Sequence, residues 1–67
     1  GRIDAVIQTA DYIYIIECKL DKSADEALRQ IEDNNYAAPF QMDKRKLYKI
    51  GVNFSSGTRG VEEYKID

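Results

Sequence analysis

The sequence predicts a small domain of the α+β or α/β class: a four-stranded mixed β-sheet with the element order β-β-α-β-β and one crossover helix. Four segments are rich in β-branched and aromatic residues, as strands are. Between the second and third of them lies one segment with the apolar spacing of a helix. Such a connection is long enough to join two parallel neighbours by a right-handed crossover. At 67 residues, the chain has room for one domain.

Residues 2–8 and 12–20 are expected to form a hairpin around a short polar break. The second run is apolar on both of its alternating faces, as is typical of a central strand covered on both sides. A loop of two or four residues pairs Asp4 with Glu17, whereas a loop of three pairs Asp4 with Ile16 and inverts every side chain. We predict the even register, or a bulge that restores it.

A helix is expected to begin at Ser23, which forms a capping box with Glu26. Its apolar positions follow helical spacing as far as Asn34, and one more turn is expected after it. Two further strands are expected, at 46–54 and 61–66, the last with the polarity of an edge strand. One helix covers only one face of the sheet, so the other face is expected to lack apolar cover.

The composition excludes several classes of site. The net charge is −2 and histidine is absent, so histidine-based metal or acid–base chemistry is excluded. The one dense basic group, 44–46, is better explained as a solvated turn than as a nucleic-acid contact. No apolar run approaches the ~20 residues that span a bilayer. The single cysteine, Cys18, fits a reducing compartment and a small buried apolar role, so we expect a soluble, cytoplasmic protein without a membrane partner.

Glu17 and Lys19 are the notable charges of the second strand. They share one face at the end of a buried strand, where an unpaired charge costs several kcal/mol. An ion pair between them is the simplest explanation. Asp4, however, faces Glu17 in the even register, and two opposed carboxylates require a proton or a cation. Hard oxygen pairs suit Mg²⁺ or Mn²⁺, and a nearby ammonium can orient a water or stabilise an oxyanion.

Three stretches follow one another in a recognisable order: GRID at 1–4, IIECK at 15–19, and a helix at 23–31 that carries Gln30. In this order and spacing the chain resembles the PD-(D/E)XK nuclease superfamily. More narrowly, it resembles the nuclease-like domain that follows an AAA-type ATPase-like domain in bacterial proteins. The resemblance implies a truncated restriction-endonuclease-like core. Residues 1–67 are thus expected to be a single domain, a fragment of a longer chain.

The resemblance also implies roles for individual residues. Asp4 and Glu17 would be metal ligands for Mg²⁺ or Mn²⁺, a set that the Cys18 carbonyl can complete. Lys19 would be the catalytic lysine. Gln30 is either a helix residue turned toward the site or an amide on the helix flank.

Two basic residues near the expected site, Lys22 and Arg29, are candidates for phosphate binding, although exposed helix charges are usually only solvated. Tyr36 has core packing as its expected role.

The implied function is metal-dependent hydrolysis of phosphodiesters in nucleic acid, and DNA is expected as the partner more than RNA. The alternative is a catalytically inactive nuclease-like module for protein association or for regulation of an attached ATPase. Intact Asp4, Glu17 and Lys19 favour the enzyme, whereas the slightly acidic charge balance favours the inactive module. The expected partners are nucleic acid and an upstream ATPase-like domain of the same chain. The isolated fragment is expected to form a homo-oligomer through its uncovered sheet face.

Overall fold

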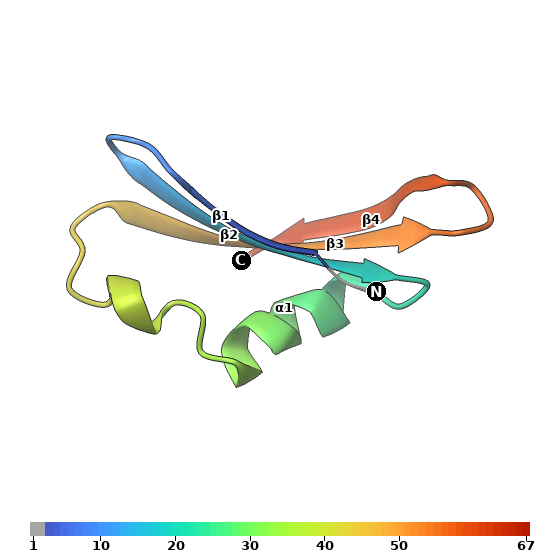
Figure 1. Ribbon diagram of the computed structural model, residues 1–67, viewed down its shortest axis with the longest axis horizontal. Coiled ribbons are helices and arrows are strands. Elements are labelled where there is room, and N and C mark those ends of the chain that lie inside the picture. The colour runs from blue at the N-terminus through green and yellow to red at the C-terminus, as the bar shows by residue number, and fades with distance from the viewer. Residues whose placement is uncertain (1–2) are drawn as a thin grey trace.

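The computed structural model describes residues 3–67, with side chains from residue 5 onward. Over this range a four-stranded sheet carries one α-helix and a short 3₁₀ turn on the same face (Figure 1). The strands are β1 (Ile3–Gln8), β2 (Tyr12–Leu20), β3 (Lys46–Ser55) and β4 (Gly60–Ile66), and α1 (Ala24–Asp33) and η1 (Ala38–Phe40) lie between β2 and β3. The predicted element order is therefore confirmed.

The two central strands of the sheet are its parallel pair. The strand order is β1-β2-β3-β4, with β2 parallel to β3 and with β1 and β4 antiparallel at the edges. The crossover through α1 and η1 makes this possible, because two parallel neighbours cannot be joined by a tight turn. The predicted mixed sheet with one crossover helix is thus present.

The hairpin of β1 and β2 has the even register. Asp4 is the backbone partner of Glu17. The turn is closed by Thr9 and Tyr12: the Thr9 N–H donates to the Tyr12 carbonyl at 2.8 Å, and the Tyr12 N–H donates to Thr9 Oγ1 at 3.0 Å. Because opposed residues of an antiparallel pair belong to one face, positions 4 and 17 share a face of the sheet.

The core lies between β2 and α1. Ile13 and Ile15 of β2 and Ile31 of α1 are buried together. The partly buried residues packed against them are Leu28, Tyr36, Ala37, Phe40 and Leu47. Tyr36 therefore packs against the core, as expected from the sequence, and η1 supplies the additional turn predicted after the helix.

Two separate parts of the chain hold the N-terminus of α1. Ser23 is extended, with φ −148° and ψ 160°, and its Oγ accepts the Glu26 N–H at 3.0 Å, which is one half of the predicted capping box. The Ala24 N–H donates to the Glu63 carboxylate of the edge strand β4, at 2.9 Å. Lys65 of β4 also binds the Asp25 carboxylate, at 3.0 Å. The edge strand thus fixes where the helix begins.

The face opposite α1 is open and apolar. Tyr12, Tyr14 and Tyr48 form an aromatic cluster there, with ring centroids 5.7 to 6.1 Å apart. Ile7 of β1 and Ile66 of β4 are 49% and 57% exposed. In the part of the chain that the structure describes, both helical segments lie on the other side of the sheet (Figure 1). The expected lack of apolar cover is therefore observed, and none of the helices described has the length and apolarity to cross a membrane.

Gly51 is a point of close approach between β3 and the helix. It is the backbone partner of Glu17, and a Cβ at this position would lie 2.4 Å from the Ala24 carbonyl oxygen and 3.0 Å from the Leu28 nitrogen. Both are backbone atoms, which cannot swing aside as a flexible side chain can. Any larger residue would therefore push α1 away from the sheet.

We predict that Gly51→Ala lowers the free energy of unfolding by about 1–3 kcal/mol, because the helix must shift to admit the methyl group. Urea denaturation followed by circular dichroism measures the change. Gly60→Ala is the matched control, since a Cβ there meets nothing within 4 Å. Its effect should stay within about 0.5 kcal/mol. Equal effects of the two substitutions would show that the close approach at Gly51 is not required.

Candidate functional site

Glu17 is a buried carboxylate at the centre of the sheet. Its side chain is 0% exposed and lies on the same face as Ile13 and Ile15, beneath α1. The alternation of the strand determines this placement, because every second residue of β2 points toward the helix. Burying a carboxylate is costly unless it is paired, hydrogen-bonded or bound to a metal. Such a position is therefore typical of a functional group.

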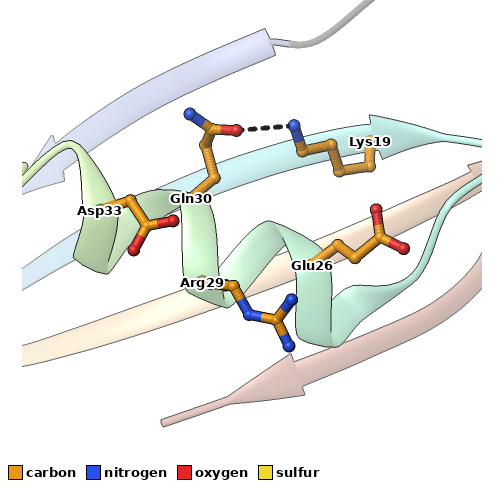
Figure 2. Close-up of a pocket in the computed structure, with 5 residues that line it drawn as sticks. All are labelled: Lys19, Glu26, Arg29, Gln30 and Asp33. Carbon is orange, nitrogen blue, oxygen red and sulfur yellow. Dashed lines mark hydrogen bonds between the residues drawn. The ribbon is translucent and has the colours of Figure 1, made fainter.

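Lys19 follows on the same face, at the end of β2, and it is half-buried. Its Nζ donates to Gln30 Oε1 at 3.0 Å, as the dashed line in Figure 2 marks. Gln30 comes from α1, so one hydrogen bond joins the end of the central strand to the middle of the helix. The contact holds the ammonium group on the helix side of the sheet.

A shallow hollow surrounds this contact (Figure 2). It has a volume of about 180 Å³ and is lined by Lys19, Glu26, Arg29, Gln30 and Asp33. Its chemistry is mixed, since two cations and an amide can bind an anion while two carboxylates repel one. All but Lys19 come from α1, so the position of the helix determines the shape of the hollow.

The structure brings some of the predicted residues together and leaves others apart. Gln30 and Arg29 join Lys19 at the hollow. Lys22 is exposed, and its side chain is not part of that lining. Cys18 is half-buried, and by strand alternation its side chain belongs to the open face. The Asp4 side chain lies outside the described residues, so only its backbone partnership with Glu17 is known.

Two residues, one in the lining of the hollow and one next to Lys19 in the sheet, were missed by the sequence analysis. Glu26 was assigned only a capping role, yet it also lines the hollow. Asn53 of β3 was given no role, yet it is 3% exposed, and its Oδ1 accepts the Lys22 N–H at 2.8 Å. A signal existed for Asn53, because the alternation of 46–54 places this amide on the same face as Gly51.

The basic group at 44–46 is only partly a solvated turn. Lys44 and Lys46 are exposed, as expected, but Arg45 is half-buried and tied into the fold. Its guanidinium forms a salt bridge with Asp43 at 2.7 Å and donates to the Thr9 carbonyl at 3.0 Å. The hydrogen bonds from Arg45 lower the pKa of Asp43 to about 2. The expectation of a solvated side chain was wrong for Arg45, because its guanidinium N–H groups reach the turn of the first hairpin.

The donor chemistry fits a divalent cation. Among the described residues no three histidine, cysteine, aspartate or glutamate side chains come together as a metal site, and the Asp4 side chain falls outside that range. The opposed positions 4 and 17 nevertheless carry two carboxylates, which are the hard oxygen ligands that Mg²⁺ and Mn²⁺ prefer. The residue types at positions 4 and 17 therefore agree with the expected ion, while the structure shows no metal site among the described residues.

Comparison with known proteins gives the family. Residues 1–64 match a family model described as the PD-(D/E)XK nuclease superfamily. A protein of Azotobacter chroococcum mcd 1, described as "Uncharacterized protein in vnfD 5'region", is 29% identical over 69 residues. That match covers 100% of this chain but 13% of the relative, so the chain spans only a small part of that relative's length. No solved structure matches significantly. Because the family model matches nearly the whole sequence, this chain belongs to the PD-(D/E)XK nuclease superfamily.

Proposed function

We propose that this domain hydrolyses phosphodiester bonds of nucleic acid, DNA in preference to RNA, with Mg²⁺ or Mn²⁺ as cofactor. One observation carries the proposal. Lys19 Nζ lies 3.0 Å from Gln30 Oε1, two residues after the fully buried Glu17, in a chain of the nuclease superfamily. This combination places an acid, an ammonium and an amide at one end of the central strand.

Glu17 would hold the cation, with Asp4 and the Cys18 carbonyl as the other proposed ligands. A bound Mg²⁺ or Mn²⁺ would supply Lewis acidity and neutralise charge on the phosphate. Burial is the useful property of Glu17. The surrounding sheet and α1 bury the carboxylate, and burial strengthens any electrostatic interaction that it makes.

Lys19 would stabilise the negative charge that develops on the phosphate. An ammonium has three donors, and Gln30 accepts one of them. The remaining two can reach phosphate oxygens in the hollow. Because the contact with Gln30 already directs the side chain, less conformational freedom is lost when the substrate binds.

Arg29 is the proposed partner of a neighbouring phosphate. It lines the same hollow as Lys19, although its guanidinium points away from the Lys19 ammonium (Figure 2), and it can form two parallel hydrogen bonds with one phosphate. Lys22 is proposed to contact a phosphate further along the nucleic-acid strand, since its side chain is not among those lining the hollow. Glu26 and Asp33 lie on the same helix and would repel additional phosphates. These opposing charges favour binding of one phosphodiester over a dense array of phosphates.

The retained Glu17, Lys19 and Gln30 support an enzyme over an inactive module. We further propose that the domain acts in the cytoplasm, attached to an upstream ATPase-like domain of the same chain, as the family resemblance implies.

The first prediction concerns cleavage. The full-length protein should cut DNA oligonucleotides with Mg²⁺ or Mn²⁺, and EDTA should stop the reaction. Lys19→Met should lower the cleavage rate by about 100-fold or more, since one donor to the developing charge is lost. Lys44→Met, at an exposed lysine, should leave the rate unchanged. The proposal fails if the wild-type protein cuts neither DNA nor RNA with any of these ions, or if Lys19→Met is fully active.

The second prediction concerns the metal. Millimolar Mg²⁺ or Mn²⁺ should raise the melting temperature of the full-length protein, because an ion that binds the folded state stabilises it by mass action. Glu17→Gln should abolish most of that rise, whereas the exposed Glu62→Gln should retain it. Differential scanning calorimetry measures both. A rise of equal size in the wild-type protein and in Glu17→Gln would remove Glu17 from the metal site.

The third prediction concerns assembly. We propose that the isolated 67 residues self-associate through the open sheet face, because it carries the tyrosine cluster together with exposed Ile7, Ile66 and Tyr64. A second copy of the same face would bury these side chains. Sedimentation at micromolar concentration should therefore give a dimer or a larger species. A folded monomer under these conditions would contradict the prediction.

A further inference from the structure

Asn53 is a polar residue buried inside the sheet. It is 3% exposed and lies near the C-terminal end of β3, two residues before Ser55. A buried amide must be hydrogen-bonded if it is not to destabilise the fold. Asn53 Oδ1 accepts the backbone N–H of Lys22 at 2.8 Å. The chain has left β2 at Lys22, so no neighbouring strand pairs with this N–H. The Asn53 side chain supplies the acceptor in its place.

Lys22 belongs to the connection 21–23 between β2 and α1. The residue before it, Asp21, has φ 53°, and its N–H donates to the Phe54 carbonyl at 2.8 Å. The Asp21 carboxylate accepts the Ser56 N–H at 3.0 Å and the Ser56 hydroxyl at 2.6 Å. These two bonds lower the pKa of Asp21. The connection is therefore fastened along the end of β3, with Asn53 as its buried attachment.

The same connection determines the geometry of the candidate site. Lys19 lies just before it and is the backbone partner of Asn53 in the parallel ladder. Gln30 lies after it, within α1. The Lys19–Gln30 contact of 3.0 Å spans 11 residues, and its length depends on how the connection starts the helix. A shift of the connection along β3 would carry Gln30 away from Lys19.

We propose that Asn53 is a positioning residue of the nuclease site: it holds the connection 21–23 so that α1 presents Gln30 to Lys19. This inference rests on the proposed function. Asn53 does not line the hollow and acts only through the Lys22 N–H. Its effect should consequently appear in the rate of the chemical step more than in substrate binding, since a misplacement of about 1 Å can cost about 100-fold in rate.

The test compares two variants of the full-length protein. Asn53→Leu keeps the branched shape of the side chain, although it is larger, and removes the acceptor; Ile31→Val is a core control that loses stability without touching the connection. We expect Asn53→Leu to lower kcat by about 10-fold to 100-fold with KM within about twofold. Ile31→Val should keep kcat within about twofold. The proposal is overturned if Asn53→Leu, measured per folded molecule, is as active as Ile31→Val.

Asp21→Ala provides the test if Asn53→Leu does not fold, because Asp21 fastens the same connection from the exposed side. Asp21→Ala should also lower kcat, with KM unchanged. An unchanged kcat would overturn the proposal.

A second readout does not depend on cleavage. Hydrogen exchange of the full-length protein should be faster at amides 22–30 in Asn53→Leu than in Ile31→Val. If the wild-type protein cuts no nucleic acid, the proposed function fails, and this comparison alone decides whether Asn53 positions α1. Equal exchange in the two variants would show that it does not.

Discussion

The contact between α1 and β3 at Gly51 is the constraint on which the rest of the domain depends. With no side chain on this residue, the helix backbone comes so close that an added Cβ would be 2.4 Å from the Ala24 oxygen. That closeness covers Glu17, which pairs with Gly51 in the sheet. The same helix carries Gln30, which accepts the hydrogen bond from Lys19. The proposed site therefore rests on a helix whose backbone contact with β3 contains none of the proposed catalytic groups.

The elements of the fold could be predicted because local patterns specify them. Alternating apolar residues mark the strands, and Ser23 marks the helix start. The first hairpin was compatible with loops of two, three or four residues, and the even register that was predicted for it is confirmed by the pairing of Asp4 with Glu17. The contacts that hold the helix in place could not be predicted. Glu63 binds the Ala24 N–H across 39 positions, and Asn53 binds the Lys22 N–H across 31. Both are polar residues of common surface types, and only the assembled sheet brings them to their partners.

The candidate site was predictable only in part, for a related reason. Glu17 and Lys19 are neighbours in one strand, so alternation alone places them on one face. The direction in which Gln30 and Arg29 point depends on where α1 begins and on how it is rotated about its axis. The capping residue indicates the start, but tertiary contacts determine the rotation. Glu26 shows the limit of local patterns, because one side chain occupies a capping position and also lines the hollow. The lining of the hollow, with two cations and two carboxylates, is therefore balanced in charge, within a chain whose net charge is −2.

The bonds from β4 to the helix tie the last strand of the chain to the opening turn of α1. Every residue from Val61 to Ile66 is exposed, so this edge belongs to the part of a fold that opens most easily. Each opening removes the acceptor of the Ala24 N–H and the partner of Asp25 in one event. Fraying of the C-terminal strand would then loosen the helix that carries Gln30. The stability of β4, which does not itself line the hollow, therefore contributes to how well the hollow keeps its shape.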